Sequence, residues 1–359
     1  MSGRRVLVMG LASYWGGRLA QALEGFEQIE TIIGVDANDP TMELERTEFV
    51  RVSNRHGLIQ RIVRAAEIDT VIDARLTVNS VAASPRATHE NNVIGTMNIL
   101  AACSGPGSPV RKFVFKSSAH YYGCEQDDPS FFTESMRRPH PPRTRLERGM
   151  VDAESAVRDF AVKTPEVEVT VLRCANVLGP DVDTAFTRMF SLPAVPMVLG
   201  FDPRVQFVHE DDVVHALEHA ALNSVPGVFN VGADGVLSLS EAIGLLGKMY
   251  LPILPPYGAG LLAGPLRRLG LRIPDEMWNQ LRFGRGLDNR AYKAAGFRYG
   301  YTTREAVLRF GEHLRLTPVM RGGEHEYTYE REVEEFLRWS PHIQREREGA
   351  ATDREPLGI

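Results

Sequence analysis

Cysteine and lysine are both scarce in this chain of 359 residues. Its three cysteines, Cys103, Cys124 and Cys174, are odd in number and follow no paired spacing, which argues against a disulfide framework and against a zinc site. We therefore expect a reducing, cytoplasmic setting and no bound metal. Lysine supplies only five of the 41 lysines and arginines, an imbalance that we attribute to genomic base composition rather than to phosphate recognition.

The sequence also lacks a strong charge bias and an unbroken hydrophobic run. The formal net charge is −5 and no block of basic residues occurs, so we expect a small-molecule partner and no nucleic acid. The apolar run at 6–8 is too short for a signal sequence. Prolines and glycines interrupt the longest apolar stretch, residues 249–266, which excludes a plain membrane-spanning helix.

Short β-branched runs alternate with segments of helical period along the first half of the chain, a rhythm typical of a parallel sheet with crossover helices. We predict an α/β fold, a doubly wound parallel Rossmann sheet with a smaller C-terminal substrate-binding portion. The expected strands lie at 6–9, 31–35, 49–52, 70–72, 112–116 and 167–172, with helices at 89–103 and 148–162. The expected organisation is an NAD-binding domain at 1–180, completed by strands near 205–209 and 228–231, a mainly substrate-binding portion at 181–320, and a charged extension at 321–359 with a flexible end.

A glycine turn follows the first strand and leads directly into a helix, the context of a phosphate-binding turn. Gly10 permits the tight turn and Gly16 permits close helix packing, whereas Ser13 takes the place of the middle glycine. Asp36 ends the second strand 20 residues after Gly16, where a carboxylate suits a ribose diol and disfavours a 2′-phosphate. A plain tight loop and a strand-ending carboxylate are the alternative reading. The predicted NAD site comprises Gly10, Ser13, Tyr14, Trp15, Gly16 and Asp36.

Five further motifs occur in order between residues 91 and 232. They read NNVIGT (91–96), FKSSAHYYG (115–123), LRCANVLGP (172–180), FVHEDDV (207–213) and FNVG (229–232). With the glycine turn, they make the chain resemble the extended short-chain dehydrogenases of the NAD-dependent epimerase/dehydratase family, which includes UDP-galactose 4-epimerase. The resemblance spans about residues 4–315 and implies NAD as cofactor, a nucleotide-sugar as substrate, and a possible homodimer.

The resemblance also implies roles for individual residues. Asn92 would contact the cofactor, and Ala74 and Arg75 follow the fourth strand, where small apolar residues usually line the cofactor. Ser118 would hydrogen-bond the reacting hydroxyl of the substrate. Asn176 and a displaced Arg204 would face the diphosphate.

The catalytic tyrosine and lysine of this family are missing. Alignment on Glu154 places Leu146 and Met150 at their positions, and no Tyr-x-x-x-Lys occurs anywhere in the chain. Neither replacement can exchange a proton, so activity is an open question, and His120 is the candidate surrogate because a histidine exchanges protons near neutral pH. A non-catalytic NAD-binding regulator or scaffold is the main alternative. A reductase of a lipid-like hydroxyl or keto compound, based on the apolar stretch, is a further one.

Overall fold

The computed structural model describes residues 3–52, 56–78, 84–253 and 275–316. Met1–Phe310 form one compact unit and Gly311–Ile359 a second, and every element of the site lies in the first. The predicted extension at 321–359 and most of the apolar stretch lie outside the described residues. Within the described ranges, no helix combines the length and the apolar character that crossing a membrane requires.

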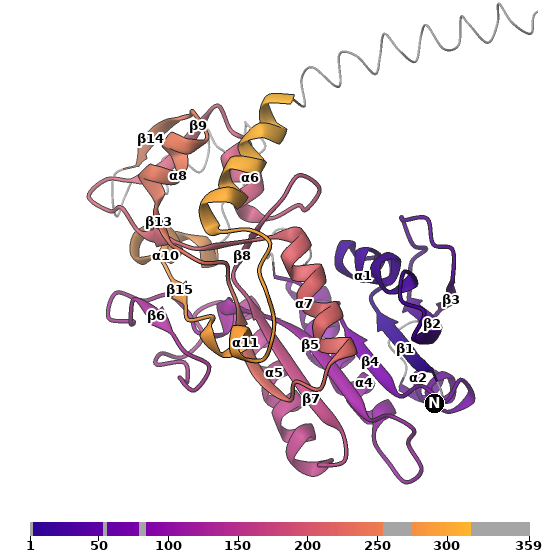
Figure 1. Cartoon of the computed structure of the whole chain (residues 1–359). Helices are drawn as coiled ribbons and strands as arrows, with labels where there is room; N and C mark the ends of the chain where they lie inside the picture. The colour runs from indigo at the N-terminus through magenta and orange to yellow at the C-terminus, as the bar shows by residue number, and fades with distance from the viewer. Residues whose placement is uncertain (1–2, 53–55, 79–83, 254–274, 317–359) are drawn as a thin grey trace, which may run out of the picture. The chain divides into compact units, whose positions relative to one another are not determined.

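A seven-stranded parallel sheet forms the centre of the first unit (Figure 1). In spatial order its strands are β12 (Gly227–Val231), β7 (Glu168–Cys174), β5 (Lys112–Ser118), β4 (Thr70–Asp73), β1 (Arg4–Met9), β2 (Ile29–Asp36) and β3 (Thr47–Arg51). The order reverses between β1 and β4, and open α/β sheets bind ligands at the carboxyl ends of the strands beside such a reversal. The predicted doubly wound parallel sheet is confirmed.

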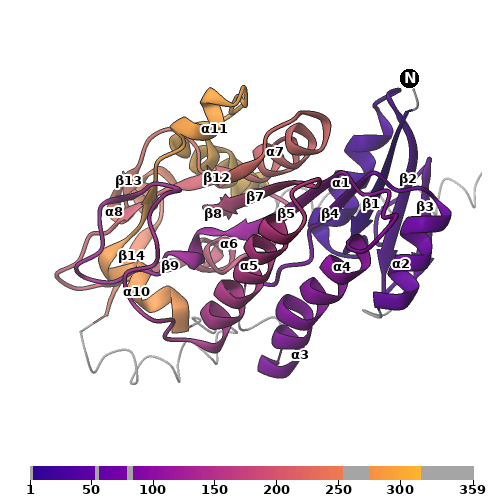
Figure 2. The same ribbon diagram turned by 90° about the horizontal axis from the view of Figure 1, so that it is seen from below.

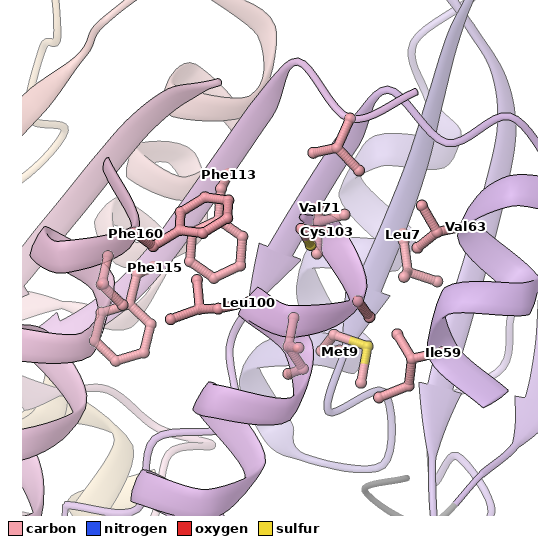
Figure 3. Packing of buried hydrophobic residues seen from close by; sticks show 14 of the residues in the cluster. Leu7, Met9, Ile59, Val63, Val71, Leu100, Cys103, Phe113, Phe115 and Phe160 are labelled. Carbon is pink, nitrogen blue, oxygen red and sulfur yellow. The ribbon is translucent and has the colours of Figure 1, made fainter. Parts of the chain in front are cut away.

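Side chains alternate between the two faces of this sheet, and each face is covered by helices (Figure 2). Leu7 and Met9 of β1 pack in one core cluster with α2 (His56–Ala65), α4 (Thr96–Cys103) and α5 (Arg145–Lys163). Figure 3 shows this cluster. Val6 and Val8 pack on the opposite face with α1 (Tyr14–Glu24) and α7 (Glu210–Leu222).

The inner face of α5 is packed against the central sheet. Leu146, Met150 and Val157 are 3%, 1% and 0% exposed and belong to the cluster of Figure 3. These three side chains are therefore packed inside their own chain, and the homodimer stays a prediction.

Two later strands take different places. The strand expected near 228–231 is β12, an edge of the central sheet, whereas the strand expected near 205–209 is β11 (Phe207–His209) and pairs with β8 (Asn176–Leu178) in a separate two-stranded sheet. Its assignment to the central sheet was wrong. The physical reason is that β12 already occupies the free edge of β7, and this pairing continues to Ala175, whose N–H bonds the Val231 carbonyl at 2.8 Å.

The helix expected at 89–103 is divided into three parts. These are α3 (Pro85–His89), the π-helix η1 (Glu90–Gly95) and α4. The π-helical turn is a rare form that occurs often at functional sites. The remaining elements are η2 (Ala119–Tyr121), β6 (Phe131–Phe132), α6 (Ala185–Ser191), β9 (Ala194–Val198), β10 (Arg204–Val205), β13 (Leu237–Ser238), α8 (Leu239–Leu245), β14 (Met249–Ile253), α10 (Asp275–Phe283), β15 (Gly286–Leu287) and α11 (Arg290–Ala294).

Candidate functional site

The turn after β1 requires glycine at two positions. Gly10 has φ +88°, in the left-handed region, and a Cβ on Gly16 would lie 2.0 Å from the Gly10 carbonyl oxygen. The Ser13 hydroxyl donates to that carbonyl at 2.6 Å and accepts the Gly16 N–H at 3.2 Å, so Ser13 caps α1. The hydroxyl at the middle position is therefore directed into the turn.

Asp36 lies beside this turn at the end of β2. Its carboxylate accepts the N–H groups of Ala12 and Asn38, each at 3.1 Å. A tight turn, a helix N-terminus and an adjacent carboxylate are the parts that hold the pyrophosphate and the ribose of a dinucleotide in Rossmann folds. The residues present thus fit NAD at this end of the site.

Arg75 departs from the small residue that is usual after β4. Its side chain is 8% exposed and forms an ion pair of 2.8 Å with the buried Asp73. A Cβ on Gly10 would meet the Arg75 Cγ at 2.5 Å, so the arginine stem lies directly over the turn, and the N–H of Ala74 bonds the Met9 carbonyl at 3.2 Å. The guanidinium donates to Asp73 and to Asn91.

Two asparagines of the π-helix η1 fix the segment that follows Arg75. Asn91 donates to the Arg75 carbonyl at 2.8 Å. Asn92 accepts the N–H of Thr77 at 2.9 Å and donates to its carbonyl at 2.8 Å. Because both polar groups of Asn92 are used on Thr77, this side chain positions the loop beside the turn, and its contact with a cofactor stays a prediction.

A cavity with about 670 Å³ of space, part of it open to solvent, lies past the carboxyl ends of β5 and β7. Its lining is mostly apolar, as in many small-molecule sites. The lining residues used in the argument are Trp15, Lys116, Ser118, His120, Asn176 and Gln280. Asn176 therefore lies where a ligand could reach it, whereas Arg204 is exposed on β10 and does not line this cavity.

Ser118, His120 and Gln280 form a hydrogen-bonded chain in the cavity wall. Ser118 Oγ lies 2.9 Å from His120 Nδ1, and His120 Nε2 lies 2.9 Å from Gln280 Nε2. The Gln280 Oε1 is buried without a partner among the described residues. Turning the amide over, which exchanges its oxygen and nitrogen, pairs Oε1 with the Nε2–H of the imidazole.

This tautomer leaves Nδ1 of His120 as an acceptor. Ser118 Oγ already accepts the backbone N–H of His120 at 3.3 Å, so its own hydrogen is directed to Nδ1. Burial, with Arg285 and Arg138 nearby, holds the pKa of His120 well below its usual range. The imidazole is therefore neutral at neutral pH and can take a proton through Ser118.

The lowered pKa of His120 predicts a pH dependence of stability. The unfolded chain binds this proton below about pH 6.5 while the folded chain does not, so stability falls as the pH drops below that value. Urea unfolding at pH 7 and pH 5 measures the free energy of unfolding at each pH. Between these two values, His120→Gln should lose less of this free energy than the wild type, by up to about 1.4 kcal/mol per pH unit. The control His56→Gln, at an exposed position, should follow the wild type. Equal slopes for His120→Gln and wild type would contradict the lowered pKa.

A buried polar network connects α5 to the central sheet. Arg173 of β7 forms an ion pair with Glu154 and donates to Tyr122 Oη at 2.7 Å, and Ser117 donates to Glu154 at 2.9 Å. Glu154 is the residue on which the missing dyad was aligned. One and two turns earlier, Met150 and Leu146 face the core and do not line the cavity.

Lys116 and Gln280 were not predicted from the sequence. A lysine in the middle of an otherwise apolar strand, in a chain with only five lysines, is the sequence feature that could have identified Lys116. Gln280 had no signal, because it meets His120 across 160 residues of chain. Across the described ranges, no three His, Cys, Asp or Glu side chains gather as a metal site.

Comparisons with known proteins agree with the motifs. The model of the NAD dependent epimerase/dehydratase family matches residues 6–232. An uncharacterized protein of Mycobacterium tuberculosis, Rv0501, is 36% identical over 327 residues, covering 88% of this chain and 85% of that protein. Rice UDP-glucose 4-epimerase 2 is 27% identical over 194 residues, covering 49% of this chain and 45% of that enzyme.

Solved structures show the same architecture. MoeE5 in complex with UDP-glucose and NAD aligns with a TM-score of 0.65 at 21% identity, over 87% of this chain and 99% of that one. UDP-glucose 4-epimerase of Thermotoga maritima with UDP-glucose aligns with a TM-score of 0.64, also at 21% identity and over the same shares. At this identity the likeness establishes the fold.

Proposed function

This chain belongs to the NAD-dependent epimerase/dehydratase family, and from that membership we propose that it binds NAD and acts on a nucleotide-sugar, with Ser118 and His120 in place of the usual tyrosine and lysine. The cofactor predicted from the sequence, NAD, is the cofactor on which this family depends. The hydrogen bond of 2.9 Å between Ser118 and His120 in the cavity wall is the observation that carries the proposal.

The turn at Gly10 and Gly16, with Asp36 beside it, would hold NAD, which when bound takes up a hydride and can return it. Removing a hydride from a carbon that carries a hydroxyl also requires removing the hydroxyl proton. Ser118 can accept that proton while passing its own to Nδ1 of His120. General base catalysis of this kind contributes typically 10²- to 10⁴-fold.

The nucleotide-sugar class is supported by the cavity and by the relatives. Asn176 lines the cavity on the side of β8 and offers an amide to a ligand. The rice and Thermotoga relatives are named UDP-glucose 4-epimerases, and MoeE5 was solved with UDP-glucose. UDP- and dTDP-linked sugars are therefore the first compounds to assay.

Calorimetric titration of the full chain with NAD, NADH, NADP and NADPH tests the first half of this proposal. We expect NAD or NADH to bind more tightly than the phosphorylated forms, because Asp36 would repel a 2′-phosphate. In an Asp36→Asn variant, the difference in affinity between NAD and NADP should become smaller. If none of the four binds below millimolar concentration, NAD binding is wrong for this chain.

Turnover of UDP- and dTDP-sugars with bound NAD tests the second half. Ser118→Ala and His120→Ala should each lower kcat by about 10²-fold or more, whereas His56→Gln, a control at an exposed histidine, should not. NAD binding without any turnover would instead support the non-catalytic regulator or scaffold. That alternative is favoured by the apolar packing of Leu146 and Met150.

A further inference from the structure

Lys116 lies on β5 with its side chain only 2% exposed, and it lines the cavity. Its Nζ is 4.6 Å from the centre of the Trp15 ring. Among the described residues, no carboxylate or carbonyl oxygen lies within hydrogen-bonding distance of this nitrogen. Cys174 is close by, but burial raises the pKa of its thiol, so it supplies no negative charge.

Each of the other four lysines of the chain either has an oxygen partner or is exposed. Lys112 is paired with Glu168 at 3.1 Å, Lys293 with Asp234 at 2.9 Å, and Lys248 donates to the Leu192 carbonyl at 2.6 Å. Lys163 is exposed at the end of α5. Lys116 is therefore alone in being buried without an oxygen partner in the described part of the chain.

A buried ammonium without a counter-ion is costly. The penalty for removing such an ion from water is several kcal/mol, whereas a cation–π contact returns about 0.5–2 kcal/mol. The neutral amine is consequently favoured at this place, and burial lowers the pKa of Lys116. A neutral amine is a nucleophile, and Lys116 is one of the residues that line the cavity.

We propose that Lys116 is a reactive amine site that captures an aldehyde or ketone as an imine inside this cavity. The nitrogen lone pair attacks the carbonyl carbon, and the electron pair of the C=O bond moves to oxygen. Both hydrogens of the amine end on that oxygen, which leaves as water, so the step needs no oxidant or reductant. This activity does not depend on NAD.

Ser118 is placed to move these protons. Side chains two residues apart on a strand share a face, and Lys116 and Ser118 both line the cavity. The Ser118 hydroxyl can give its proton to the developing oxyanion and take one from the nitrogen, with His120 as the next acceptor. The cavity thus combines a nucleophile with a proton relay.

Reductive methylation of the full-length wild type tests the proposal without any nucleotide. The protein is treated briefly with limiting formaldehyde and cyanoborohydride, and each lysine is quantified by peptide mass spectrometry. An exposed lysine with a pKa near 10.4 is neutral in only about one molecule in 2,500 at pH 7. We expect Lys116 to react at least tenfold faster than Lys163 at pH 7. Between pH 6 and pH 9 the methylation rate of Lys116 should rise less steeply than that of Lys163.

Two variants serve as controls. Lys163→Met should leave the labelling of Lys116 unchanged, and Lys116→Met should remove the fast phase while the other lysines keep their rates. Labelling of Lys116 at or below the rate of Lys163 overturns the proposal. If, in addition, inorganic phosphate raises the Tm of the wild type but not of Lys116→Met, the lysine is a charged anion site instead. Because no nucleotide is present, a failure of NAD binding leaves this result unaffected.

Discussion

Replacing Arg173 by methionine is expected to lower the free energy of unfolding by about 3–5 kcal/mol. Arg173 and Glu154 are 2% and 0% exposed and form an ion pair, so the substitution leaves the Glu154 carboxylate buried without its partner. The Tyr122 hydroxyl loses a donor at the same time. Urea unfolding followed by circular dichroism measures the change.

The matched control is a surface pair of the same chemistry. Arg304 and Glu241 form an ion pair of 3.1 Å and are both exposed, and exposed ion pairs contribute about 0–1 kcal/mol. Arg304→Met should therefore change stability little. A double variant, Arg173→Met with Glu154→Leu, should recover much of the loss because no charge stays buried. A loss below about 1 kcal/mol for Arg173→Met alone would count against the network.

Restoring the family's lysine by Met150→Lys should destabilise the protein by about 4–5 kcal/mol near pH 7, because burial lowers a lysine pKa by about 3–5 units and the penalty at pH 7 is limited by the interval between pH 7 and about 10.4. Met150 is 1% exposed and packed in the hydrophobic core between α5 and the sheet. Since the folded-state pKa would be lowered, the penalty is full below that pKa and shrinks as the pH rises toward about 10.4. Urea unfolding at pH 7 and pH 9.5 measures both effects.

The same helix provides the control for this experiment. Val162 is 81% exposed on α5, so Val162→Lys introduces the same side chain into water and should be nearly neutral. If Met150→Lys is as stable as Val162→Lys, the packing of α5 against the sheet is not as described.

These expectations bear on how the protein functions without the usual dyad. The face of α5 that carries the tyrosine and lysine in the family is here part of the hydrophobic core. The side chains that line the cavity and can exchange protons or act as nucleophiles are Lys116 and Ser118 of β5 and His120, which follows it. Chemistry in this cavity would therefore depend on a strand rather than on a helix.

Much of the scaffold followed from local sequence. Alternating β-branched runs predicted the central strands, because burial on both faces of a parallel sheet requires them. The glycines at 10 and 16 predicted the turn, since only glycine fits their backbone and spacing. Ser118 and Asn176 line one cavity because both lie at or just after the carboxyl ends of parallel strands, and their contacts with a substrate stay predictions.

The sequence by itself thus determined the sheet, the turn and the absence of the dyad, which all depend on residue type and short-range order. Only the tertiary structure decided that Gln280 meets His120, that Arg75 is held by Asp73 over the turn, that β11 lies outside the central sheet, and that Lys116 has no oxygen partner among the described residues. Partner identity and desolvation arise from packing between segments far apart in the chain. No local pattern encodes them.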